Sequence, residues 1–368
     1  MKDRMINCTV EAVENLYKKK DWCGIFNNIG NLRIPTQNPL SIEGYVCDQP
    51  NSIWQIIDQD SNITVYSSDG FLDKITGNPD TILDYPKDIF LIDRTSKSTV
   101  AKNNYGVVLM TERSAKSEIL KLEWSEPLTF NQNYSWHRFF TDEGRDMAKI
   151  PSNSLIIIDR YLFTDFDLGI YNLCGILDEI LPTKFNDDYH ILIVSDPSEF
   201  KRYVKSPKNK KKNKALVDVK IAATEIFNAI STLRNQFRLQ VELLALESFE
   251  GDRVTLSDKI HFDVYSDTHN RRIVSNTFII RAEHKFCAIK KYKNTILQSN
   301  ASQTIWFDAN YAGVDKKYQN IHALPIKVAE GIIKTLRKIV DNHINIGRYF
   351  LNGKEGNSES IINRLLRN

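Results

Sequence analysis

THNRRIVSNTFII, at residues 268–280, joins a polar motif to a short apolar run that is typical of a strand. The motif spaces His269, Arg271 and Asn276 as His-x-Arg-x-x-x-x-Asn. Successive side chains of a strand alternate between its two faces, so His269 and Arg271 are expected to project from the same side. Asn276 is expected to return to them after a bend. An imidazole, a guanidinium and an amide in this arrangement are suited to holding a phosphate.

This spacing resembles the His-x-Lys-x-x-x-x-Asp/Asn signature of the phospholipase D superfamily, in which the His attacks phosphorus and the Lys and Asn hold phosphate oxygens. Arg271 stands where that signature has Lys, and the chain holds one copy where the family uses two. A nearer match is the phospholipase D-like domain of microtubule-interacting-and-trafficking proteins and their bacterial relatives. Their His-Asp-Arg-x-Ile/Val-x-x-Asn pattern is similar to residues 269–276, and the resemblance covers residues 153–291.

The resemblance implies a phospholipase D-like domain of a branch commonly interpreted as binding domains that have lost catalysis. Intracellular bacterial relatives of this kind look like components of antiphage defence or nucleic-acid-processing systems. An enzymatic alternative stays open, because a homodimer could bring two copies of His269 to one cleft as a metal-independent phosphodiesterase or nuclease. In either case His269, Arg271 and Asn276 are the expected site residues, and no cofactor is expected.

Strand-length apolar runs precede the motif at residues 155–158, 191–194 and 239–246, and helical patterns at residues 173–180 and 215–237 separate them. Apolar strands that alternate with helices are typical of an α/β fold with a mostly parallel, mixed sheet flanked by helices. Further strands are expected at residues 259–265, 278–280 and 304–307, followed by a long helix at residues 324–350.

The length of 368 residues is typical of about two domains. We expect an N-terminal α+β module at residues 1–150, the phospholipase D-like domain at residues 151–322, and a C-terminal helix and tail at residues 323–368. Within the module, alternation at residues 52–57 and 62–67 predicts a β-hairpin. A helix is expected from residue 10, and buried strands at residues 89–92 and 105–110.

Hydrophobic residues make up 42% of the chain and charged residues 26%, which is ordinary for a globular protein with a sizeable core. The five cysteines are scattered without Cys-x-x-Cys spacing, which favours reduced thiols over disulfides or a zinc site. No signal peptide or membrane-spanning run is recognised, so a cytoplasmic protein without a membrane partner is expected. No metal site is predicted, because the aspartates that follow the strands lack a neighbouring ligand set. These aspartates are Asp159, Asp165, Asp167 and Asp196.

Positive charge is concentrated in the second part of the chain. Residues 1–150 carry 17 Lys and Arg against 21 Asp and Glu, whereas the remainder carries 32 against 25. Residues 201–214 hold eight Lys and Arg without an acid, and such a run predicts a flexible loop. The loop is expected to capture nucleic acid through its phosphates, and a solvated loop without a ligand is the alternative. The lysines expected to bind are Lys205, Lys208, Lys210, Lys211, Lys212 and Lys214. A partner protein or a second copy of the chain is a further possible partner.

Overall fold

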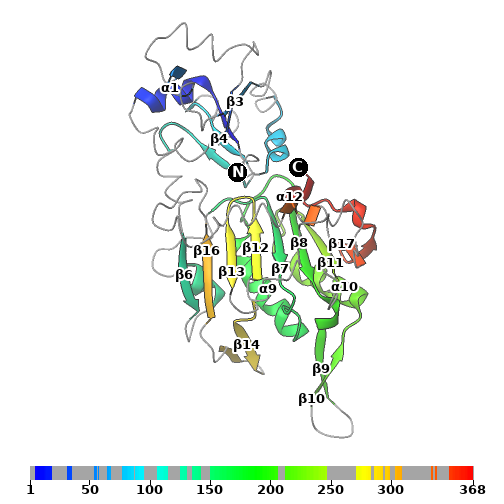
Figure 1. Ribbon diagram of the computed structural model, residues 1–368. Coiled ribbons are helices and arrows are strands. Elements are labelled where there is room, and N and C mark those ends of the chain that lie inside the picture. Colours follow the sequence, from blue (N-terminus) through cyan, green and yellow to red (C-terminus); the bar gives the residue numbers. More distant parts are fainter. Residues whose placement is uncertain are drawn as a thin grey trace, which may run out of the picture.

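The computed structural model describes residues 5–18, 31–34, 54–55, 57, 64–67, 77–86, 88–94, 106–114, 125–130, 135–141, 150–205, 212–246, 271–282, 286–292, 295–298, 303–308, 333–334, 336–337 and 348–367. Within these ranges the strands form one five-stranded sheet, one nine-stranded sheet and two two-stranded sheets. The five-stranded sheet lies above the nine-stranded sheet in Figure 1. Strands and helices together confirm the expected α/β class.

The N-terminal sheet has the order β3-β2-β1-β4-β5, and all of its neighbouring strands are parallel. Its elements are β1 (Ile6–Cys8), α1 (Val10–Lys18), β2 (Asn31–Ile34), β3 (Thr64–Ser67), η1 (Pro79–Asp84), β4 (Ile89–Leu91) and β5 (Val108–Met110). The hairpin expected at residues 52–67 is wrong, because Trp54 and Ile57 are helical and β3 pairs in parallel with β2. Parallel neighbours require crossover connections rather than a tight turn, so this module is α/β and not α+β.

The larger sheet has the order β18-β17-β11-β8-β7-β12-β13-β16-β6. Its strands are β6 (Ser125–Phe130), β7 (Ser154–Ile158), β8 (Tyr189–Ser195), β11 (Leu239–Ala245), β12 (Arg271–Ser275), β13 (Ile279–Ala282), β16 (Gln303–Asp308), β17 (Arg348–Leu351) and β18 (Lys354–Gly356). Only β7, β8 and β11 run parallel to one another, while the other neighbours pair in antiparallel fashion. The sheet is therefore mixed, as expected, but the expectation that it is mostly parallel is wrong.

Helices and two hairpins surround this sheet. They are α8 (Trp136–Thr141), α9 (Phe166–Ile180), η4 (Pro197–Glu199), β9 (Lys201–Lys205), β10 (Lys212–Leu216), α10 (Val219–Ser231), β14 (Ile289–Tyr292), β15 (Thr295–Gln298), η5 (Ser358–Ser360) and α12 (Arg364–Arg367). The described part of the chain contains no helix with the length and apolar character needed to cross a membrane.

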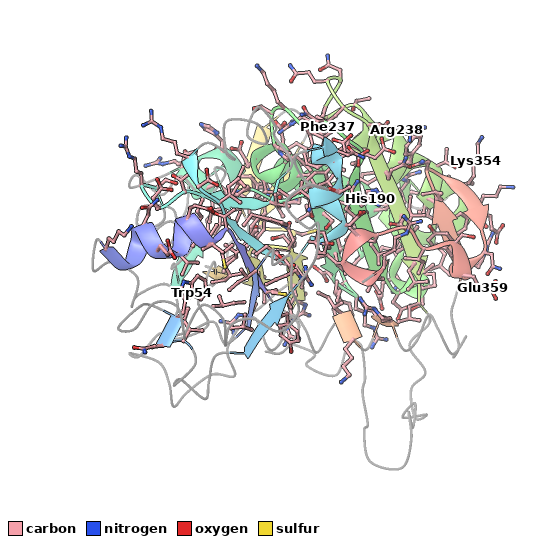
Figure 2. All side chains as sticks on the ribbon, turned by 90° about the horizontal axis from the view of Figure 1, so that it is seen from above. Trp54, His190, Phe237, Arg238, Lys354 and Glu359 are labelled. Atoms are coloured by element: carbon pink, nitrogen blue, oxygen red, sulfur yellow. The ribbon has the colours of Figure 1, made fainter. Side chains whose placement is uncertain are left out.

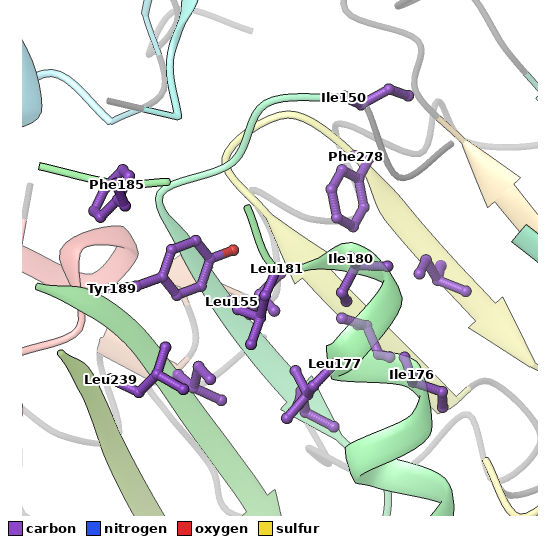
Figure 3. Close-up of a cluster of buried hydrophobic side chains, with 14 of the residues drawn as sticks. Ile150, Leu155, Ile176, Leu177, Ile180, Leu181, Phe185, Tyr189, Leu239 and Phe278 are labelled. Atoms are coloured by element: carbon purple, nitrogen blue, oxygen red, sulfur yellow. The ribbon is translucent and has the colours of Figure 1, made fainter. Parts of the chain in front are cut away.

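One face of the central strands packs against α9. Leu155, Tyr189 and Leu239 project from three adjacent strands toward this helix, which contributes Ile176 and Leu177 (Figure 3). All five side chains are buried, and burial of one large apolar side chain is worth about 1.5 to 3 kcal/mol. This packing fixes the position of α9 and hence of the loop between β7 and α9.

The opposite face is covered by the C-terminal segment. Leu192 and Leu244 lie in one apolar cluster with Ile361, Leu365 and Leu366. The helix expected at residues 324–350 does not reach its predicted end, because residues 348–351 form β17 beside β11. Residues 333–334 and 336–337 are helical. The chain then returns through a hairpin turn in which Asn352 and Gly353 have φ angles of 50° and 76°, a conformation that favours Asn-Gly.

A buried carboxyl group holds the C-terminal segment against the sheet. Oε1 of Glu242 accepts hydrogen bonds from the Tyr349 hydroxyl and from the backbone N–H of Ile362, both at 2.8 Å. Burial raises the pKa of Glu242 to about 7 and lowers the pKa of the nearby His190 to about 4. His190, labelled in Figure 2, is buried. Both side chains are thus stabilised in their neutral forms under the segment that covers them.

We predict that Glu242→Gln changes the pH dependence of stability. The folded pKa of Glu242 lies above the ordinary value of 4.5, so its stabilising contribution is complete below pH 4.5 and is lost as the pH rises through about 7. Glutamine does not titrate. The free energy of unfolding of the variant minus that of the parent should therefore rise with pH across this window, by on the order of 3 kcal/mol.

Urea denaturation from pH 4.5 to 8 measures this difference, and taking the difference removes the opposite contribution of His190. Glu359→Gln, which alters an exposed carboxylate, is the control and should give a curve parallel to that of the parent. A parallel curve for Glu242→Gln as well would contradict the assignment of a raised pKa to Glu242.

Candidate nucleic-acid interface

The carboxyl ends of β7, β8 and β11 meet at one edge of the sheet, because these three strands are parallel. Arg271 begins β12, which runs antiparallel to β7 with Arg272 opposite Ile158, so Arg271 lies at this same edge. Ligands of open α/β sheets gather at the carboxyl ends of the strands. Arg271 therefore lies where such ligands gather, whereas His269 lies outside the described residues.

Asp159 follows β7 and organises this edge. Its Oδ1 accepts a hydrogen bond from the backbone N–H of Tyr161, and its Oδ2 accepts one from that of Phe286, both at 2.9 Å. The carboxylate is buried, and Nε of Arg271 lies 3.9 Å from Oδ1. Asp159 thus joins the loop after β7 to the segment before β14, which is a structural use of its two oxygens.

A second ion pair and an aromatic ring complete the cluster. Nε of Arg160 lies 3.1 Å from Oδ2 of the buried Asp196, which follows β8. The guanidinium groups of Arg160 and Arg271 lie 5.4 and 5.3 Å from the centroid of the Tyr161 ring, within the range of cation–π contacts. Two guanidinium groups therefore balance two carboxylates, and the cluster carries no excess charge to attract a phosphate. Among the described residues no group of His, Cys, Asp and Glu is arranged to hold a metal ion.

Asn276 does not join this cluster. It follows the last residue of β12, and the five steps along the chain from Arg271 to Asn276 span roughly 16 Å in extended conformation. Its Nδ2 donates to the carbonyl of Gly106 at 3.0 Å, and its Oδ1 accepts from the backbone N–H of Asn153 at 2.9 Å. The expectation that Asn276 bends back to Arg271 is wrong, because the turn after β12 leads directly into the antiparallel β13.

This contact joins the N-terminal sheet to the larger one. Gly106 has a φ of +60°, and a Cβ at this position would lie 1.8 Å from the carbonyl oxygen of Ser152. Only glycine fits so close to the neighbouring backbone. Asn276 is therefore a structural residue at the junction of the two sheets, at the sheet edge opposite to the carboxyl ends of the parallel strands.

The basic segment forms a hairpin, which we call the arm (residues 201–216). Strands β9 and β10 pair in antiparallel fashion, with Lys205 opposite Lys212 and Tyr203 opposite Lys214. The arm projects beyond the sheet at the end away from the N-terminal sheet (Figure 1). The expectation of a flexible loop is therefore wrong for residues 201–205 and 212–214. Lys208, Lys210 and Lys211 lie outside the described residues.

The base of the arm is fixed by long-range contacts. The ring of Phe200 lies 5.1 Å from that of Phe163, and the backbone N–H of Lys201 donates to the Phe163 carbonyl at 3.0 Å. Arg202 forms ion pairs with Asp167 on α9 and with Glu225 on α10. These contacts orient β9 between two helices, which explains why a strongly charged segment adopts a regular conformation.

Positive charge increases from the base of the arm outward. At the base, Lys201 is paired with Glu199 at 2.9 Å, and Arg202 with two carboxylates. Farther along, the ammonium of Lys214 donates to the carbonyl of Thr164 at 3.1 Å and lies 5.1 Å from the centroid of the Tyr203 ring. Neither partner cancels its charge. The sequence from residue 200 to 217 contains no Asp or Glu, so the outer lysines give the arm a net positive charge.

No family model matches this chain, and no curated protein matches it. The phospholipase D-like identity inferred from residues 269–276 consequently remains a prediction. The α/β fold class is supported by the structure and does not depend on a known relative.

Sequence reasoning missed Tyr161 and Tyr203 as members of the site. Tyr161 stands two residues after Asp159, close to a predicted strand end, and that proximity was an available signal. Tyr203 is the single aromatic residue within the basic run, and an aromatic residue among lysines is a recognised pattern of nucleic-acid binding.

We predict that Asn276→Ala lowers stability and leaves ligand binding intact. The substitution removes the partners of two buried backbone groups, the carbonyl of Gly106 and the N–H of Asn153. The expected cost is about 2 to 4 kcal/mol of unfolding free energy, at about 1 to 3 for each group left without a partner. Thermal denaturation measures stability, and fluorescence anisotropy with a labelled oligonucleotide below the melting temperature measures binding.

Arg271→Ala is the matched comparison, because Arg271 lies at the carboxyl edge. If Asn276→Ala weakened binding as much as Arg271→Ala while leaving the melting temperature unchanged, the two residues would share one phosphate site after all. That outcome would restore the motif-based interpretation.

Proposed function

We propose that this protein binds nucleic acid through the arm, by phosphate contacts that do not select bases. The observation that carries the proposal is the register of the arm, which pairs lysines from two strands in a segment without acidic residues. Adjacent strands lie about 4.8 Å apart, and alternate residues of one strand about 6.6 Å apart. Lysines from both strands therefore occupy paired positions on one narrow ribbon.

A polymeric anion suits this arrangement better than a small one. A small phosphate ligand is typically held in a concave site by several donors that converge on it. The arginines around Tyr161 do not form such a site, because they are paired with Asp159 and Asp196. The arm projects away from the sheet, and its charge is spread along its length. Spread lysines bind a phosphate backbone by releasing its counterions, without reading the sequence.

Replacing Lys210, Lys211 and Lys212 together by Ser should weaken binding and reduce its salt dependence. Each phosphate neutralised contributes about 0.9 to the slope of log K against log salt concentration for duplex DNA. Loss of three such contacts should therefore lower the slope by about 2.7. Anisotropy titrations of labelled DNA at several salt concentrations provide the slope.

The control removes the same number of charges elsewhere, by changing the exposed Lys184, Lys334 and Lys354 to Ser. This variant should keep the slope of the parent, because these lysines lie outside the arm. Equal slopes for the parent and the arm variant would remove the arm from the interface, and equal reductions in both variants would indicate attraction by net charge alone.

A homodimeric phosphodiesterase that uses His269 from each subunit is the second candidate. The observation in its favour is that Arg271, two residues after His269, begins β12 beside the carboxyl ends of the parallel strands, where open α/β sheets commonly bind ligands. His269→Asn should then abolish cleavage of a labelled oligonucleotide without reducing its binding, since amide and imidazole differ in nucleophilicity. If the dimeric parent shows no cleavage with either metal or chelator present, the enzyme hypothesis fails and binding remains.

A further inference from the structure

Tyr203 is an exposed aromatic residue in the middle of β9. The residue is 45% exposed, although large apolar residues in the described part of the chain are mostly buried. It stands opposite Lys214 in the hairpin, so the two side chains share one face of the ribbon. An aromatic ring is therefore displayed beside a cation, on the same structure to which we have assigned phosphate binding.

We propose that the arm preferentially binds single-stranded nucleic acid, with Tyr203 as the platform on which an unpaired base stacks. This inference rests on the proposed phosphate binding by the arm and adds the class of nucleic acid. Bases in a duplex are already stacked on their neighbours and present only their edges in the grooves. Bases in a single strand expose their faces, and stacking on an aromatic ring is the interaction that they gain.

The surroundings of the ring are suited to this role. The ammonium of Lys214 lies 5.1 Å from the ring centroid, and its hydrogen bond to the Thr164 carbonyl ties it to the body of the domain. Thr164 is itself fixed by a hydrogen bond from its hydroxyl to the Tyr161 carbonyl. Tyr203 is thus oriented before binding, and a strand that stacks on it places its backbone close to Lys214.

Aromatic character, and not mere apolar exposure, distinguishes Tyr203 from its neighbour. Val204 is 44% exposed and lies on the opposite face of β9, since successive residues of a strand alternate. Val204 offers no π-face to a base. Val204 is therefore a suitable control for Tyr203, because the two residues are similarly exposed and only Tyr203 has an aromatic ring.

The test measures the affinity of the full chain for a labelled single strand of about 20 nucleotides and for the duplex of the same sequence, at several salt concentrations. Tyr203→Ser should weaken single-strand binding by roughly 5- to 150-fold, the range for loss of one base–aromatic stack. Duplex affinity and both salt slopes should stay unchanged, because no phosphate contact is removed. Tyr203→Phe and Val204→Ser should both behave like the parent, and melting temperatures establish that each variant is folded.

Each other outcome has a definite meaning. An unchanged single-strand affinity in Tyr203→Ser, an equal loss for both nucleic acids, or a loss in Tyr203→Phe as large as in Tyr203→Ser would overturn the stacking role. The proposed phosphate binding would survive these results. A parent protein that binds neither the single strand nor the duplex would overturn the proposed function itself. Should Tyr203→Ser be unfolded, Tyr203→Leu replaces it, with the same expected loss because leucine also lacks a π-face.

Discussion

The central strands β7, β8 and β11 are buried on both faces. The need to shield both faces constrains the positions of the elements around the larger sheet. A parallel sheet of apolar strands is stable only when both faces are shielded from water. Helices α9 and α10 shield one face, and residues near the C-terminus shield the other. The second cover is a short segment held by a few contacts. Glu242 is one of them, and its neutral form suits the dry surface beneath Ile362 better than a carboxylate would.

Because both faces are covered, the amino and carboxyl ends of the parallel strands remain accessible to other parts of the chain, and the two ends have different roles. At the amino edge of the parallel strands, Asn276 and Gly106 join the two sheets through buried hydrogen bonds. At the carboxyl edge the chain emerges in loops, and the arm extends from it. A motif read as one site in the sequence is consequently divided. Arg271 belongs to the carboxyl edge, and Asn276 belongs to the junction.

The sequence predicted the elements whose signal is local. The apolar runs at residues 155–158, 191–194 and 239–246 were recognised as strands, because continuous burial leaves a continuous apolar pattern. The turn at Asn352 was missed although Asn-Gly is a strong hairpin signal, since a helical pattern was extended to residue 350, over most of the strand that precedes the turn. The arm could not be predicted from its own residues. Eight positive charges argue against order, and Asp167 and Glu225, which pair with Arg202 at the base of the arm, are distant in the sequence.

The electrostatics of the carboxyl edge complement those of the arm. Because Arg160 and Arg271 face Asp196 and Asp159, the edge contributes little field beyond its own contacts. Surface charges act over a Debye length of about 8 Å at physiological salt, so an anion approaching the domain responds mainly to the outer lysines of the arm. The position of the arm is set by the contacts of its base with Phe163, Asp167 and Glu225. Under the proposed function, the arm and not the neutral cluster would set the position of a bound strand.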